Sequence, residues 1–199
     1  IWNNMLFDDM PDDDVLFDAD DDDAPLGADE SAVAEIPSPR ATEHLIGHTQ
    51  IEQQLLDMYA SKRFPHGLIF SGPEGIGKSV MAFRLARFLF AQAEKGNAGP
   101  SLFGDAPVAP TSLFIPHADA VFQRVVSGGH PDLRTVERLV DEKTGRLKGS
   151  VGVDEIRKIA PFLRRTSSVE NGWRIVIVDD ADTMTRESQN SLLKILEEP

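Results

Sequence analysis

The chain has 199 residues, no cysteine and a formal net charge of −13 at pH 7. That length fits one domain of ordinary size plus a tail. The lack of cysteine excludes disulfides and cysteine-based zinc sites and favours a reducing, cytoplasmic location. Because no run of eighteen apolar residues is present, we expect no membrane-spanning helix and no membrane partner.

The negative charge is concentrated at the N-terminus. Residues 1–40 hold thirteen acidic residues and one basic residue, Arg40, which leaves 20 acidic and 19 basic residues in the remainder. This composition predicts a disordered acidic tail over 1–40 and a folded domain over 41–199. Two Leu-Phe-Asp clusters in the tail, at 6–8 and 16–18, are either scattered apolar residues in a solvated segment or short docking peptides for a partner.

The folded part begins with a helix, a strand and a second helix. Thr49 and Glu52 have the spacing of a capping box ahead of an apolar stripe, which predicts a helix over 48–60. A short apolar run predicts a strand over 67–71. The amphipathic segment that follows predicts a helix over 79–92.

Residues 94–130 are rich in glycine and proline and show no clear period. They predict a long insertion with helix only near 118–126. Beyond it we expect a strand at 133–136, a charged turn or hairpin at 141–148, and a helix capped by Asp154.

The C-terminal part repeats the alternation of strand and helix. The β-branched run that ends Trp173–Val178 predicts a buried strand of a parallel sheet. Thr185 is placed to cap a last helix over 186–198. Strands that alternate with helices indicate an α/β fold of three layers around a central parallel sheet.

The turn between the first predicted strand and the helix at 79–92 carries the pattern G-x-x-x-x-G-K-S at 72–79. Between a strand and a helix, this pattern predicts a phosphate-binding loop, or P-loop, whose backbone N–H groups and helix dipole hold the phosphates of a nucleotide. Lys78 supplies a charge for the β- and γ-phosphates, and the Ser79 hydroxyl can bind Mg²⁺. A plain glycine turn is the alternative. The expected nucleotide contacts are Gly72, Pro73, Glu74, Gly75, Ile76, Gly77, Lys78, Ser79 and Val80.

Two acidic residues follow the predicted strand that ends at Val178. An aspartate at the carboxyl end of a neighbouring strand can hold the Mg²⁺ that Ser79 also binds, so Ser79 and Asp179 are the expected metal ligands. A carboxylate that polarises the attacking water is expected at the next position, which is Asp180. Asp180 is either that catalytic residue or an acid favoured by a helix dipole, and its side chain is one methylene shorter than that of glutamate.

Residues 174–199 resemble the clamp-loader branch of the AAA+ ATPases. The ending N-x-L-L-K-x-L-E-E-P at 190–199 is a signature of bacterial clamp-loader subunits. The loop at 72–79 and His-Pro-Asp-Leu at 130–133 match the same family. Residues 141–157 resemble delta-prime subunits of DNA polymerase III, in the style of alphaproteobacteria. The resemblance covers the whole of the predicted domain.

The resemblance implies a subunit of the hetero-oligomeric clamp loader of DNA polymerase III, which closes a ring-shaped sliding clamp on primed DNA in replication. It implies ATP and Mg²⁺ as cofactors, the other clamp-loader subunits as partners, and contact with the clamp and DNA through the complex. In the family the delta-prime subunit is a stator that contributes an arginine finger. A DNA polymerase or transferase label would follow only from membership of the holoenzyme.

The chain departs from the family in two ways. Many relatives carry a four-cysteine zinc module where this chain has Glu94–Gly129, so we expect no zinc. The arginine finger and the lid and collar domains of the family lie beyond the position of Pro199. We therefore expect this chain to be the N-terminal part of a longer protein.

Whether the chain hydrolyses ATP is left open. A stator of the delta-prime type is the first interpretation. A motor ATPase of the gamma/tau type is the second, and Asp180 in place of glutamate counts against it. A small-molecule P-loop kinase is a distant third, because such an enzyme needs an arginine-rich lid and the insertion at 94–130 holds only Arg124.

Overall fold

A computed structural model describes residues 37–97, 109–170 and 172–197, which all lie in the second of the chain's two units, residues 36–199. Both Leu-Phe-Asp clusters and most of the predicted acidic tail lie outside the described residues. In chain order the elements are α1 (Thr49–Ala60), α2 (Lys78–Asn97), α3 (Ala120–Val126), β1 (Leu133–Val136), α4 (Val153–Arg157), α5 (Ile159–Leu163), β2 (Ile175–Val178), the 3₁₀ helix η1 (Ala181–Thr183) and α6 (Arg186–Glu197).

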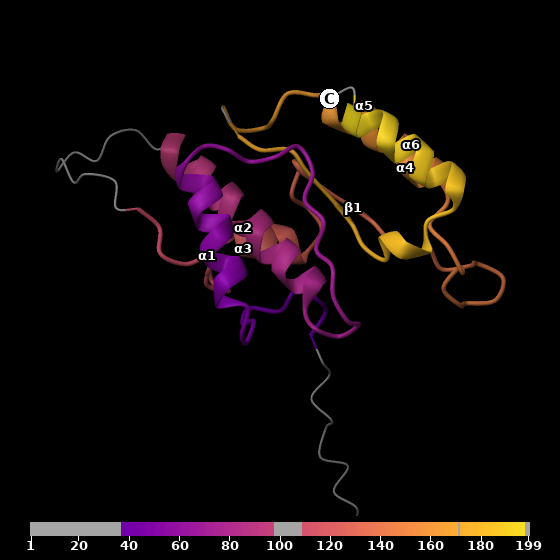
Figure 1. Ribbon diagram of the computed structural model, residues 1–199, viewed down its shortest axis with the longest axis horizontal. Coiled ribbons are helices and arrows are strands. Elements are labelled where there is room, and N and C mark those ends of the chain that lie inside the picture. The colour runs from indigo at the N-terminus through magenta and orange to yellow at the C-terminus, as the bar shows by residue number, and fades with distance from the viewer. Residues whose placement is uncertain (1–36, 98–108, 171, 198–199) are drawn as a thin grey trace, which may run out of the picture. The chain divides into compact units, whose positions relative to one another are not determined.

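β1 and β2 form a parallel pair whose register runs from Leu133 opposite Ile175 to Val136 opposite Val178. Successive side chains of a strand point to opposite faces. Ile175 and Ile177 accordingly join the hydrophobic cluster of α1, α2 and α3, whereas Val176 and Val178 join the cluster of α4, α5 and α6. Figure 1 shows α2 and α3 on one side of the strand pair and α4, α5 and α6 on the other. The α/β class with a parallel sheet is confirmed.

The prediction of a strand at 67–71 is wrong. This segment is not a strand, and no backbone hydrogen bond joins it to any other part of the chain that the structure describes. Ile69 is 94% exposed. A strand needs a neighbour for its N–H and C=O groups, and among the described residues β2 pairs only with β1. The apolar run favours an extended backbone, but hydrogen bonding to a neighbouring strand depends on residues far away in the sequence.

The predicted capping box at the start of α1 is also wrong. The N-cap is His48, and its side chain makes no capping hydrogen bond. The Glu52 carboxylate instead accepts hydrogen bonds from Leu113 N at 2.7 Å and Ser112 Oγ at 2.9 Å. It also pairs with the Arg84 guanidinium at 3.4 Å. Tertiary donors therefore outcompete the local backbone for this carboxylate.

The helix predicted to start at Asp154 is divided into α4 and α5. Gly152, not Asp154, is the N-cap of α4, and the helix breaks at Lys158. Proline has no N–H to donate, so it is tolerated in the first turn of a helix and disfavoured further along. A new start after Lys158 places Pro161 in the first turn of α5. The predicted cap of α6 is confirmed, because Thr185 Oγ1 accepts a hydrogen bond from Ser188 N at 3.2 Å.

The predicted insertion at 94–130 is more ordered than its sequence indicates. Helix α2 continues to Asn97, and Asp119 caps α3 by accepting a hydrogen bond from Val121 N at 2.8 Å. Residues 98–108 lie outside the described part. Beyond them, Leu113 and Phe122 are fully buried in the cluster around α2. An irregular segment can fill a core without a periodic pattern.

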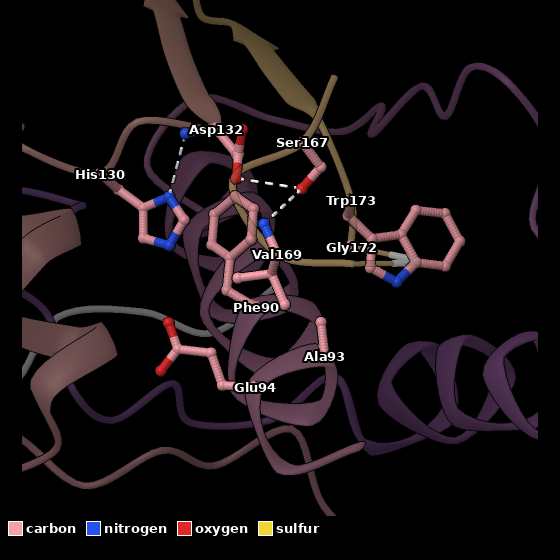
Figure 2. A pocket seen from close by; sticks show the side chains of 9 residues that line it. All are labelled: Phe90, Ala93, Glu94, His130, Asp132, Ser167, Val169, Gly172 and Trp173. Atoms are coloured by element: carbon pink, nitrogen blue, oxygen red, sulfur yellow. Dashed lines mark hydrogen bonds between the residues drawn. The ribbon is translucent and has the colours of Figure 1, made fainter. Parts of the chain in front are cut away.

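A buried polar junction fastens the start of β1 to the loop before β2 (Figure 2). Asp132 is 1% exposed, and its carboxylate accepts hydrogen bonds from Ser167 Oγ at 3.1 Å, Ser168 N at 2.9 Å and Ser168 Oγ. The Arg174 guanidinium lies 3.2 Å from the other carboxylate oxygen. Burial raises the pKa of Asp132, but the Ser168 and Ser167 hydrogen bonds and the Arg174 charge outweigh burial and hold that pKa below its usual value.

His130 lies beside this junction. Its ring stacks on Phe90 with centroids 3.8 Å apart, and its Nδ1 accepts a hydrogen bond from Asp132 N at 3.3 Å. Burial lowers the pKa of His130, and the Arg124 charge lowers it further. The adjoining cavity has a volume of about 10 Å³, room for about one water molecule. The junction is therefore structural and is not a substrate pocket.

We expect Asp132→Ala to destabilise the protein by roughly 3–5 kcal/mol, because it leaves the largely buried Arg174 guanidinium without its charge partner. Chemical denaturation monitored by tryptophan fluorescence measures this loss. Asp154→Ala is the matched control, since it removes an exposed Asp154–Arg157 pair and should cost only about 0–1 kcal/mol. Equal losses for the two variants would contradict the assigned role of the junction.

We also expect the free energy of unfolding to fall as the pH falls below about 6.5, the ordinary pKa of histidine. The folded state holds the pKa of His130 below that value, so the unfolded state takes up a proton first and is favoured in acid. In His130→Gln the unfolding free energy should depend less on pH between about 7 and 5 than in the wild type. The same pH profile in both proteins would show that His130 does not cause the acid sensitivity.

Candidate functional site

The loop at 72–77 leads into the N-terminus of α2 and has left-handed φ angles at two of its glycines. Gly75 and Gly77 have φ angles of 77° and 96°, which glycine adopts without strain and other residues avoid. A Cβ at Gly77 would also lie 2.6 Å from Leu45 Cδ1. The backbone conformation therefore favours glycine at position 77, and any side chain there would also have to displace Leu45.

Lys78, the first residue of α2, lies over the loop. Its ammonium group donates hydrogen bonds to the carbonyl oxygens of Gly72 at 2.9 Å and Pro73 at 2.8 Å. The first turn of α2 contains no acidic residue. The positive end of a twenty-residue helix and a lysine charge thus meet at one place, an arrangement that favours a bound anion.

Ser79 and Asp179 are brought together although they lie 100 residues apart. Ser79 Oγ donates a hydrogen bond of 2.7 Å to Asp179 Oδ1. Asp179 N donates to Val136 O at 2.8 Å, so the pairing of β1 and β2 sets the position of the carboxylate. A hydroxyl and a carboxylate are hard oxygen donors of the kind that Mg²⁺ prefers. The two residues predicted to be metal ligands fit that ion.

Asp180 is paired through its carboxylate with Arg138. Its backbone is left-handed, with a φ angle of 52°, and its Oδ2 accepts a hydrogen bond of 2.8 Å from Arg138 Nε. The Asp180 carboxylate makes no capping hydrogen bond to η1. In the alternative role predicted for it, as an acid at a helix N-terminus, it therefore interacts with the helix dipole alone. The residue predicted to be catalytic is therefore engaged by a cation that sequence reasoning did not single out.

The remaining predicted contacts are arranged around the loop. Pro73 and Glu74 are exposed, and Val80 is half-buried in the first turn of α2. The Ile76 carbonyl oxygen lies 2.9 Å from His48 Nε2. Among the predicted contact residues that the structure describes, Lys78 and Ser79 are the two whose side chains form hydrogen bonds.

Sequence reasoning missed the groups that hold the segment in front of the loop. Arg84 and Arg87 on α2 are almost fully buried, and both donate to backbone carbonyls of residues 40–43. Two arginines three positions apart within an apolar helix could have indicated these buried contacts from the sequence. Nothing in the sequence around Arg138 marks it as a partner of Asp180.

The known proteins to which this chain is similar belong to one class. A family model described as "DNA polymerase III, delta subunit" matches residues 116–199. The chain is 29% identical over 160 residues to Replication factor C small subunit of Methanocella arvoryzae, which covers 80% of this chain and 36% of the relative. It is 29% identical over 147 residues to DNA polymerase III subunit delta' of Escherichia coli, and the match covers 74% of this chain and 37% of the relative.

A third relative is DNA polymerase III subunit gamma/tau of Mycobacterium tuberculosis, 30% identical over 166 residues, with 81% of this chain and 24% of the relative covered. The chain thus spans between 24% and 37% of the length of these relatives. Together the matches show that the chain is similar to subunits of clamp-loader type. Within that type, the delta and delta' names and the gamma/tau names all come from DNA polymerase III. No helix among the described residues is long and apolar enough to cross a membrane.

We expect Asp179→Asn to weaken Mg²⁺-dependent nucleotide binding by about tenfold or more, because loss of a partner at a metal site typically costs that much. Binding measured in the presence of a chelator should be unchanged or slightly tighter, since a negative charge near the phosphates is removed. Isothermal titration with ATP, with and without Mg²⁺, measures both. Asp182→Asn, a change at a nearby exposed acid, should affect neither, and an equal loss there would argue against a specific role for Asp179.

Proposed function

We propose that the chain is a clamp-loader subunit of the AAA+ class that binds ATP through residues 72–79. Within a hetero-oligomeric complex it would take part in loading the sliding clamp onto primed DNA. The contact between Ser79 and Asp179 carries the nucleotide part of the proposal, because it joins a glycine loop, a lysine and an oxygen pair suited to Mg²⁺. The relatives support the clamp-loader part. The helices on both faces of the strand pair support the three-layer P-loop fold.

Each residue of the proposed site has a separate role. Backbone N–H groups of the loop and of the first turn of α2 would bind the phosphates. The Lys78 ammonium would exchange the carbonyl oxygens of Gly72 and Pro73 for phosphate oxygens. Ser79 and Asp179 would hold Mg²⁺, which supplies positive charge to neutralise the phosphates.

The pairing of Asp180 with Arg138 favours a stator over a motor. To polarise a water molecule, the Asp180 carboxylate would have to leave the Arg138 guanidinium. That pair is partly exposed, and such pairs contribute only about 0–1 kcal/mol, so the pair is a bias against hydrolysis and not a permanent block. A motor ATPase remains the second candidate, because the loop and the Ser79–Asp179 pair are both in place.

The proposal is tested first by nucleotide binding. Lys78→Ala removes a charged donor worth about 1.5–3 kcal/mol, so the dissociation constant for ATP should rise about 12- to 140-fold. Lys95→Ala, an exposed lysine at the other end of α2, is the control and should bind as the wild type does. Titration of a fluorescent ATP analogue provides the measurement. A wild-type chain without affinity for ATP would overturn the nucleotide part.

Assembly tests the second part of the proposal. The complete protein, purified with the clamp-loader subunits of its own organism, should enter a stable complex that loads the clamp onto primed DNA. In the stator interpretation, assembly and the ATPase rate of the complex are unchanged by Lys78→Ala. A large loss of that rate would favour the motor ATPase, and failure to assemble with these subunits would contradict a clamp-loader role.

A further inference from the structure

The segment that precedes α1 is fastened to α2 by buried arginines. We call residues 40–48 the brace. Arg87, which is 1% exposed, donates hydrogen bonds to Arg40 O at 3.0 Å and Thr42 O at 2.8 Å. Arg84 donates to Glu43 O at 2.7 Å. Burial lowers the pKa of Arg87 to about 10, so its guanidinium is still charged at neutral pH and bonds the carbonyls strongly.

The other end of the brace lies against the phosphate loop. Leu45 packs closely on Gly77, because a Cβ at Gly77 would lie 2.6 Å from Leu45 Cδ1. His48 Nε2 lies 2.9 Å from the Ile76 carbonyl oxygen. A carbonyl oxygen can only accept a hydrogen bond, so the imidazole is the donor in this contact.

The requirements of α1 do not explain a histidine at position 48. The residue is the N-cap of α1, yet its side chain makes no capping hydrogen bond. Its φ angle is 60°, in the left-handed region that costs most non-glycine residues about 1–2 kcal/mol. Asparagine, aspartate and histidine all occur in that region, so the backbone alone does not select histidine at this position. The imidazole is used for the loop instead.

The bond to Ile76 fixes a peptide unit of the loop. Every described peptide bond is trans, so the Ile76 carbonyl and the Gly77 N–H belong to one rigid plane and point in opposite directions. When His48 holds the carbonyl on the brace side, the Gly77 N–H is directed away from the brace. Gly77 has no side chain to restrict the rotation of this peptide plane. A hydrogen bond from outside the loop is therefore needed to fix its orientation.

We propose that His48 is a positioning residue of the phosphate loop: through the Ile76 carbonyl it orients the Gly77 N–H to donate to a nucleotide phosphate. The inference rests on the proposed nucleotide binding. It assigns to the brace a role in phosphate affinity that is separate from its packing on α2. An orienting hydrogen bond of this kind contributes about 0.5–1.5 kcal/mol, which corresponds to about a 2- to 12-fold change in dissociation constant.

Two substitutions separate positioning from folding. His48→Gly removes the imidazole, but glycine is at ease at a φ angle of 60° and is tolerated at an N-cap. The melting temperature should therefore change little, while the dissociation constant for Mg²⁺–ATP rises about 2- to 12-fold. His48→Gln keeps a side-chain N–H donor of similar reach and should restore most of the affinity. His66→Gly makes the same change at an exposed histidine outside the loop and should have no effect.

The measurement is titration of the full 199-residue chain with a fluorescent ATP analogue, beside thermal denaturation of each variant. Competition by inorganic tripolyphosphate reports on the phosphate loop without the base. If the wild type binds and Lys78→Ala loses binding, but His48→Gly binds both ATP and tripolyphosphate as the wild type does, the role of His48 is overturned and the proposed function stands. Equal weakening in His48→Gly and His48→Gln would likewise overturn the donor role. If the wild type binds neither ligand, the proposed function itself fails.

Discussion

The hydrogen bond between Ser79 and Asp179 can form only where the start of α2 meets the carboxyl end of β2, and the candidate site depends on that meeting. Two kinds of packing produce it. The apolar face of α2 shares a hydrophobic cluster with Ile177 of β2, which fixes the helix against one face of the strand. Pairing with β1 then continues one residue beyond β2, because Asp179 N donates to Val136 O. Burial sets the layers, and backbone pairing sets the position of the carboxylate along the strand.

Much of this arrangement can be predicted from the sequence, because it follows from local patterns. The β-branched run before Asp179 and the glycine spacing at 72–77 both specify their backbones directly, and β1 has the predicted bounds 133–136. The strand expected at 67–71 fails because a strand depends on a partner, and no partner lies among the described residues. The Glu52 carboxylate fails as a cap because distant donors compete for it. A local sequence pattern does not show which distant group a strand or a carboxylate will pair with.

The charged residues that the sequence left unexplained have a common function. Arg84, Arg87 and Arg174 are all largely buried, and each donates to backbone carbonyls of segments that form no helix or strand or that end a helix. A guanidinium has five donors in a rigid planar fork, so one side chain can satisfy several carbonyls at once. Irregular backbone can be buried only if its polar groups are paired. These arginines therefore replace the ladder hydrogen bonds that the brace and the loop before β2 lack.

The two adjacent aspartates at the end of β2 show how the backbone divides chemical roles. Asp179 faces Ser79, whereas the left-handed turn at Asp180 directs its carboxylate to Arg138. Among the described residues, Asp179 supplies the one carboxylate that contacts Ser79. Mg²⁺ demands six oxygen ligands and is usually held by one or two carboxylates together with water and substrate phosphates. A site with one hydroxyl and one carboxylate is too sparse to hold the ion firmly alone, and phosphate oxygens on the loop would complete it. Metal and nucleotide should therefore bind as a unit, each raising the affinity for the other.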